Sequence, residues 1–266
     1  MHGGCCVGHV VLPPPVCDAS DRSLTVDHGL CRGLDAFGRR WHDYEIRGDG
    51  HIPRDRPSLV VMYHGFMPLD GWYFIARMML EHQVWMRSLT DRFLLRTPGL
   101  ARLVAAGGAI AGEPDAAYRL LQEGHTVLVS PGGVREAIAG KSWHYRVHWQ
   151  QRLGFARLAL RAQVPLIPIF GENVEELYRA PFCDRRPFQA FFEATRVPIV
   201  PVVGLGGMPF PVKLRTWVGE PVVPRPEDTP ETLKERTRQA LQALIDQHQA
   251  PRPRLPRALW QRISGA

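Results

Sequence analysis

The sequence lacks any apolar run long enough to cross a bilayer. Its best apolar stretch, residues 164–170, is far shorter than the roughly 18 residues that a spanning helix needs. The chain also does not open with the charged-then-apolar pattern of a secretory signal. We therefore expect a soluble or peripheral protein on the cytoplasmic side.

Cysteine is scarce, and its spacing is not that of a metal or disulfide site. The chain has five cysteines, and none forms a Cys-x-x-Cys pair. Structural zinc usually needs closely paired thiolates, so we predict no metal site. The odd number of cysteines and the missing export signal argue against a disulfide framework.

Signatures of nucleic-acid binding are missing as well. The net charge is +7, and such a basic balance attracts phosphate in nucleic acids, membranes or small ligands. The arginines are spread along the chain, and no zinc-finger or RNA-binding pattern occurs. We therefore expect no nucleic-acid partner and favour an anionic membrane surface or a phosphorylated ligand.

What the sequence does contain is an alternation of short apolar runs with helical patterns. Buried strands are predicted at residues 58–63, 126–129, 166–170 and 212–218. Helices are predicted at residues 69–80, 84–95, 100–106, 113–124, 149–161 and 230–248. With 266 residues and 45% hydrophobic composition, this alternation favours one α/β domain built in layers.

The two ends of the chain differ from its middle. Residues 1–40 hold a proline run and no periodicity, so they are predicted to be poorly ordered. Residues 41–250 are assigned to the domain. The tail, residues 251–266, is basic and rich in proline, with Trp260 among its apolar residues. It is either a loose terminus or a weak membrane-surface anchor.

The chemistry points to His64 and Asp70. The strand at residues 58–63 ends at His64, where α/β sheets place their ligands, and Gly65 beside it lets a substrate approach the backbone. A neutral imidazole can take a proton from a hydroxyl, while a carboxylate holds its other nitrogen. No nucleophilic side chain adjoins the pair, which suits direct attack of an alcohol on a thioester. Asp70 also has a plain interpretation as a helix N-cap.

Over roughly residues 45–225 the sequence resembles the glycerolipid acyltransferase superfamily, whose first block is a His, four residues and an Asp. Further blocks of the resemblance are residues 47–53, 129–136 and 164–173. Residues 176–178, 211–214 and 218–221 look most like the monoacylglycerol/diacylglycerol acyltransferase branch. The resemblance implies a glycerol-phosphate-acyltransferase-like fold, with a mixed sheet flanked by helices in a single domain.

The resemblance also implies an activity. It implies an O-acyltransferase that moves a fatty acyl group from acyl-CoA or acyl carrier protein to a hydroxyl of a glycerolipid or other lipid alcohol. His64 is then the general base and Asp70 orients it, with no cofactor or metal, at the inner face of the membrane. The substrate-binding residues implied are Gly65, Gly132, Gly133, Arg135, Glu136 and Pro168.

Three departures from the family pattern bear on the acceptor. Five residues, not four, separate His64 from Asp70. Gly132 stands where phosphate-using members carry a Glu, and residues 107–112 lack the arginine of the second block. With fewer side chains available to bind a phosphate group, the sequence favours a neutral acceptor. The alternatives are a lysophospholipid or 1-acylglycerol-3-phosphate acceptor, a thioester hydrolase, or a non-catalytic lipid-binding protein.

Overall fold

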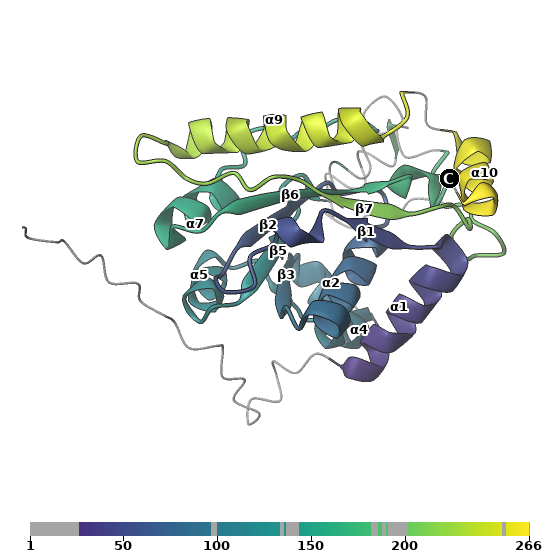
Figure 1. The fold of residues 1–266 in the computed structure, drawn as a ribbon, viewed down its shortest axis with the longest axis horizontal. Coiled ribbons are helices and arrows are strands. Elements are labelled where there is room, and N and C mark those ends of the chain that lie inside the picture. Colours follow the sequence, from purple (N-terminus) through teal and green to yellow (C-terminus); the bar gives the residue numbers. More distant parts are fainter. Residues whose placement is uncertain are drawn as a thin grey trace, which may run out of the picture.

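The computed structural model describes residues 27–96, 100–133, 136, 144–181, 186–187, 190, 202–251 and 254–265 (Figure 1). Seven strands in this part of the chain form one sheet, in the order β1-β7-β6-β2-β5-β3-β4. They are β1 (Glu45–Arg47), β2 (Leu59–Met62), β3 (Met86–Thr90), β4 (Ala109–Ala111), β5 (Thr126–Val129), β6 (Leu166–Glu172) and β7 (Arg215–Val218). Neighbours are parallel except β6 and β7, which are antiparallel, so the predicted mixed sheet is confirmed.

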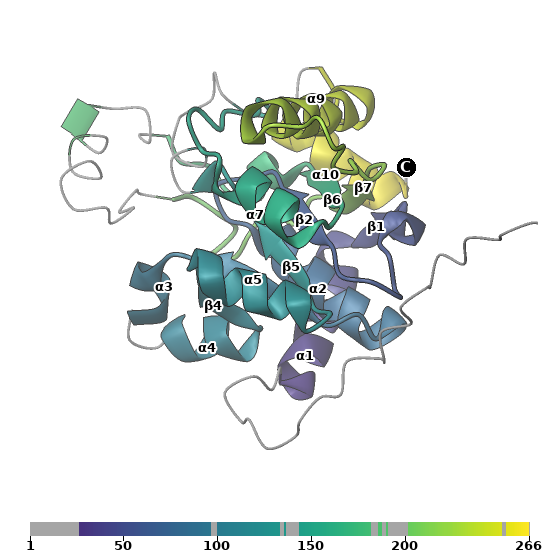
Figure 2. The same cartoon turned by 90° about the vertical axis from the view of Figure 1, so that its left-hand side faces the viewer.

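Helices cover both faces of the sheet (Figures 1 and 2). They are α1 (His28–His42), α2 (Leu69–His82), α3 (Arg92–Arg96), α4 (Leu100–Ala106), α5 (Pro114–Gln122), α7 (Gly154–Ala162), α9 (Pro230–His248) and α10 (Leu255–Ser264), with 3-10 turns η1 (Asp49–His51) and η3 (Val174–Glu176). Helices α7 and α9 lie on one face, and α1 and α2 on the other. None of the described helices combines the length and the apolar character needed to cross a membrane.

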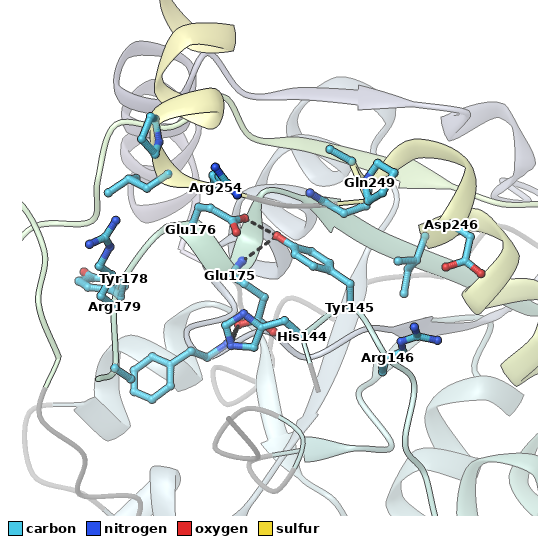
Figure 3. Close-up of a pocket in the computed structure, with 17 residues that line it drawn as sticks. His144, Tyr145, Arg146, Glu175, Glu176, Tyr178, Arg179, Asp246, Gln249 and Arg254 are labelled. Carbon is cyan, nitrogen blue, oxygen red and sulfur yellow. Dashed lines mark hydrogen bonds and ion pairs between the residues drawn. The ribbon is translucent and has the colours of Figure 1, made fainter. Parts of the chain in front are cut away.

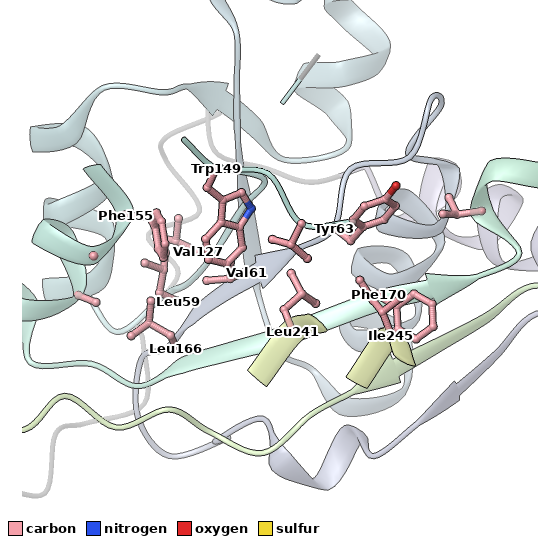
Figure 4. Packing of buried hydrophobic residues seen from close by; sticks show 14 of the residues in the cluster. Leu59, Val61, Tyr63, Val127, Trp149, Phe155, Leu166, Phe170, Leu241 and Ile245 are labelled. Carbon is pink, nitrogen blue, oxygen red and sulfur yellow. The ribbon is translucent and has the colours of Figure 1, made fainter. Parts of the chain in front are cut away.

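The core follows from the alternation of side chains along the central strand β2. Leu59, Val61 and Tyr63 face α7 and α9, in the cluster drawn in Figure 4. Val60 and Met62 belong to a second cluster, which α2 closes from the opposite face. Because β2 is buried on both faces, its successive residues are all apolar, which explains the continuous apolar run seen in the sequence.

The N-terminal boundary predicted at residue 40 is wrong, because residues 28–40 belong to α1. The helix begins at Asp27, whose carboxylate accepts hydrogen bonds from the amides of Gly29 and Leu30. Gly38 is needed for packing, since a Cβ there would lie 3.1 Å from the ring of Tyr73. Gly38, one of the glycines that obscure the helical pattern, thus allows close contact between α1 and α2. Residues 1–26 lie outside the described part.

The tail is not a loose terminus over residues 255–264, because these residues form α10. Ala258 is buried, and the amide of Lys213 donates to its carbonyl at 3.1 Å. The Arg262 guanidinium donates to the carbonyl of Arg40, at the end of α1, over 2.9 Å. The tail is therefore docked on the domain.

The helix predicted at residues 84–95 is also wrong. Residues Met86–Thr90 form β3, which pairs with β5 and β4, and only Arg92–Arg96 are helical. Apolar spacing in a short run suits either structure, and here pairing with two strands decides. The helix predicted from residue 149 begins at Gly154, because Trp149 is buried in the preceding loop against Phe155. Of the strand predicted at residues 212–218, only Arg215–Val218 form a strand, which is β7.

Candidate active site

His64 stands just past the end of β2, at the edge of the sheet where α/β proteins bind ligands. Strand β2 is fully buried, with β5 and β6 parallel on its two sides. Tyr63 still belongs to the ladder, since its amide donates to the carbonyl of Ile169 at 3.1 Å. His64 is therefore the first residue that follows the hydrogen-bonded part of the strand.

The main chain orients the His64 imidazole. Its Nδ1 lies 2.7 Å from the carbonyl oxygen of Gly65. A carbonyl can only accept, so Nδ1 carries the proton and Nε2 keeps a lone pair. Burial lowers the pKa of His64 and outweighs the carbonyl contacts, which act in the opposite direction. The ring is therefore an uncharged base at neutral pH.

Asp70 is buried in the first turn of α2, with 1% of its surface exposed. The N-cap residue is Pro68, so the interpretation of Asp70 as the cap is wrong. Burial raises the pKa of Asp70 to about 7, against the opposing effect of the helix amides. In the described part of the chain its Oδ1 has no hydrogen-bond partner, and no hydrogen bond or ion pair joins it to His64. The structure thus assigns the orienting contact to Gly65, not to Asp70.

Two glycines make room for this arrangement. A Cβ at Gly171 in β6 would lie 2.5 Å from Oδ2 of Asp70, so the carboxyl group packs directly on the strand backbone. A Cβ at Gly65 would lie 2.8 Å from Val174 in η3. The turn after His64 therefore rests on η3.

A buried network of polar side chains fixes the turn after His64. The Tyr63 hydroxyl donates to Oε1 of Glu175 at 2.6 Å, and the Phe66 amide donates to Oε2 at 3.3 Å. The Tyr145 amide donates to the Tyr63 hydroxyl at 2.9 Å, and the Tyr145 hydroxyl donates to Glu176. Burial raises the pKa of Glu175 and Glu176 to about 7. The network ties the residues on both sides of His64 to η3.

The sequence interpretation missed this network. Two consecutive glutamates after a strand look like a solvated surface pair, and Tyr145 carries no motif. Tyr63 and Glu175 are 112 positions apart, so only the fold brings them together. The available signal was the resemblance of residues 176–178 to the acyltransferase branch.

In the block at residues 129–136, Glu136 packs against Gly132, which has no side chain. A Cβ at Gly132 would lie 2.0 Å from Oε2 of Glu136, so Glu136 occupies the space that a side chain at 132 would need. Oε1 of Glu136 accepts from the His148 amide at 2.9 Å, while Oε2 has no described partner. Burial raises the pKa of Glu136 to about 7, and the main-chain amides of His148 and His64 oppose that effect. Glu136 is thus a buried carboxyl group close to the backbone of His64.

The remaining predicted site residues fall in different places. Gly133 has a φ of +55° and its amide donates to Ser130, which makes a tight turn after β5. Arg135 lies outside the described residues. Pro168 lies in the middle of β6, paired with Val61, and so packs inside the sheet rather than beside His64.

A cavity of about 810 Å³ lies next to the turn that follows His64 (Figure 3). Phe66, two residues after His64, is part of its wall. Glu175 and Glu176 from the buried network also reach it. Its other walls come from residues 144–146, 178–180, 245–246, 249–251 and 254–256.

Comparisons with known proteins match this description. A family model described as Acyltransferase matches residues 43–171. The "DGAT1/2-independent enzyme synthesizing storage lipids" of Gallus gallus is 40% identical over 229 residues, 86% of this chain and 67% of that protein. The protein of the same name in Homo sapiens is 38% identical over 229 residues, 86% and 69% of the two chains. The crystal structure of the 1-acyl-sn-glycerophosphate acyltransferase PlsC of Thermotoga maritima superposes with a TM-score of 0.54. Its identity is 18%, over 82% of this chain and 79% of that one, so it shows the fold.

Proposed function

This chain belongs to the acyltransferase family, and on that premise we propose that it transfers a fatty acyl group from a thioester donor to a lipid hydroxyl. The donor is acyl-CoA or acyl carrier protein, and the acceptor is a glycerolipid or another lipid alcohol. The observation that carries the proposal is His64, neutral at the end of β2 with Nδ1 held by Gly65.

The proposed reaction uses Nε2 of His64 as the general base. Nε2 takes the proton of the acceptor hydroxyl as its oxygen attacks the thioester carbonyl carbon. The new C–O bond forms, the C–S bond breaks, and the thiolate leaves with the electron pair. The imidazolium then returns its proton to the thiolate, so the products are an ester and a free thiol.

Asp70 and Glu136 have supporting roles in this proposal. Each is a buried carboxyl group with one oxygen lacking a described partner. Asp70 stabilises the positive charge that appears on the imidazole during transfer. Glu136, with the Gly132 and Gly133 turn, lines the side of the site where the reacting groups meet.

We propose a neutral acceptor. Gly132 stands where phosphate-using members carry a Glu, and residues 107–112 lack the arginine of the second block. The relatives at 38–40% identity are named for the synthesis of storage lipids. A lysophosphatidic acid acceptor is the second candidate, which the named substrate of the Thermotoga maritima protein favours. Because the acceptor is a lipid, we place the protein peripherally at the cytoplasmic face of a membrane.

The test is an assay of His64→Ala with labelled acyl-CoA and three acceptors: monoacylglycerol, diacylglycerol and lysophosphatidic acid. We expect a loss of at least about 100-fold in transfer, because the base is removed. The matched control is His28→Ala, at an exposed position at the start of α1. Undiminished transfer by folded His64→Ala protein would contradict the assignment.

The same assay separates the other functional classes. Free fatty acid released without acceptor would identify a thioester hydrolase. Binding to liposomes with no product from any acceptor would identify a lipid-binding protein that kept the fold. Preference for lysophosphatidic acid over the neutral acceptors would replace the proposed acceptor class with the second candidate.

A further inference from the structure

Three arginines line the cavity next to the turn after His64 (Figure 3). Arg146, Arg179 and Arg254 line it from three separate segments of the chain, and all three are exposed. Within the described residues, none of the three forms an ion pair or a side-chain hydrogen bond. Several exposed arginines elsewhere, such as Arg39, Arg92 and Arg161, are paired with carboxylates. Unpaired guanidinium groups that line one cavity are suited to bind phosphate.

The acidic residues of the cavity do not cancel this positive charge. Glu175 and Glu176 are buried and accept hydrogen bonds from Tyr63 and Tyr145. Burial raises the pKa of both to about 7, so much of their negative charge is absent at neutral pH. Asp246 also lines the cavity, and its Oδ1 accepts a hydrogen bond from Gln242 at 2.9 Å.

The remaining wall is apolar or aromatic. It includes Phe66, Tyr178, Ile245 and Leu255. The cavity thus combines an apolar wall, which includes Phe66 two residues after His64, with three cationic side chains. Its volume of about 810 Å³ falls in the range that pockets for sizeable organic ligands occupy.

We propose that this cavity binds the phosphate-bearing part of the acyl donor, a phosphopantetheine thioester, with Arg146, Arg179 and Arg254 as the phosphate ligands. The inference rests on the proposed function, because it assigns one of the two substrates to a place. Such donors carry phosphates at one end of a long, uncharged arm and the thioester at the other. Phosphates at the arginines and the arm along Phe66 direct the thioester toward His64.

The first experiment measures binding of free coenzyme A by calorimetry, without any turnover. Each of Arg146→Ala, Arg179→Ala and Arg254→Ala is expected to weaken coenzyme A binding by about tenfold, because a charge-assisted contact is lost. The control is Arg157→Ala, at an exposed position on α7 outside the cavity. Its affinity should equal that of the wild type. Unchanged affinity in the three cavity variants, with unaltered thermal unfolding, would overturn the proposal.

The second experiment distinguishes the donor from a phospholipid head group, which presents the same phosphate chemistry. In steady-state assays the cavity variants should raise KM for acyl-CoA about tenfold, with kcat and KM for the acceptor little changed. Binding to phosphatidylserine vesicles should stay the same. Loss of vesicle binding with coenzyme A affinity intact would assign the arginines to the membrane and overturn the donor site.

The proposed function and the proposed donor site can be contradicted independently of each other. If the wild type transfers no acyl group but binds coenzyme A through the three arginines, the donor site stands and the proposed function falls. If transfer depends on His64 while the arginine variants keep full affinity for coenzyme A, the proposed function stands and the donor site falls.

Discussion

Four carboxyl groups are buried around the end of β2: Asp70, Glu136, Glu175 and Glu176. Burial raises the pKa of each to about 7. In an unfolded chain such groups ionise near pH 4, so between about pH 4 and 7 the folded state binds more protons. The stability they contribute is complete in acid and is lost as the pH rises through 7. The active end of the sheet is therefore expected to weaken the fold in alkali.

Asp70→Asn tests this at one residue, because it keeps the shape and removes the ionisation. We expect its free energy of unfolding to exceed that of the wild type by roughly 1–3 kcal/mol at pH 8, and by less at pH 5. Urea unfolding at the two pH values measures the difference. Asp55→Asn, at an exposed position, should show no such pH dependence. An equal gain for Asp70→Asn at both pH values would be evidence against a raised pKa.

The same variant separates stability from activity. If Asp70 stabilises the charged imidazole, Asp70→Asn should lose transfer activity while it gains stability at pH 8. Full activity in this variant would remove Asp70 from the proposed site and leave His64 with the Gly65 carbonyl alone.

At the scale of residues, the sequence could predict that His64 follows a buried strand, but not which distant residues surround it. A histidine that follows an apolar strand is visible in a linear pattern, and so is the glycine after it. The contacts of Tyr63 with Glu175, and of Glu136 with Gly132, depend on where distant segments meet. The contact expected between Asp70 and His64 is absent among the described residues, because Nδ1 of His64 donates its hydrogen bond to the carbonyl of Gly65.

Among the elements, the buried strands were the most predictable. Strands β2, β5 and β6 are apolar runs because both of their faces are covered. The strand β1 and the polar residues of β3 carry no such signal, since their order comes from neighbours such as β7 and β5. Helix α1 was missed because its glycines lower helix propensity.

Those glycines allow a prediction within one helix. At Gly33 an added Cβ meets nothing within 4 Å, so Gly33→Ala should stabilise the protein by about 0.5–1 kcal/mol. At Gly38 the same Cβ lies 3.1–3.3 Å from the buried ring of Tyr73, so Gly38→Ala should gain less or lose stability. Thermal unfolding of both variants decides. Equal gains would mean that α1 and α2 are not in close contact at Gly38.

At the scale of the whole molecule, the exposed apolar side chains are unevenly placed. Half of the large ones in the described residues lie in a single hairpin, residues 202–208: Val202, Val203, Leu205 and Met208 are 39–51% exposed. Leu205 and Met208 pair with each other across its turn. Val203 pairs with Arg179, which lines the cavity. The hairpin thus presents an exposed apolar tip that is suited to insert into a bilayer surface.

We therefore expect the hairpin to be part of the proposed membrane contact. Leu205→Asp with Met208→Asp should reduce binding to phosphatidylserine vesicles about tenfold or more, because two apolar side chains can no longer insert. Vesicle co-sedimentation measures this, and Val223→Asp, at another exposed position, is the matched control.

The competing contact is α10, where Trp260 and Ile263 are 66% and 77% exposed. Trp260→Ala with Ile263→Ala tests it in the same sedimentation assay. If these substitutions abolish binding and the hairpin variant binds normally, the tail is the anchor and the hairpin is not.

The contact between α1 and α10 has a consequence for how the chain folds during its synthesis on the ribosome. Arg262 bonds to the carbonyl of Arg40, 222 positions earlier, and Arg215 in β7 bonds to Glu45 in β1 across 170 positions. The parallel partner of β1 is therefore synthesised long after β1 itself. Until β7 emerges, β1 lacks its parallel neighbour, as in other folds of high contact order. The nascent chain should need a chaperone over this interval.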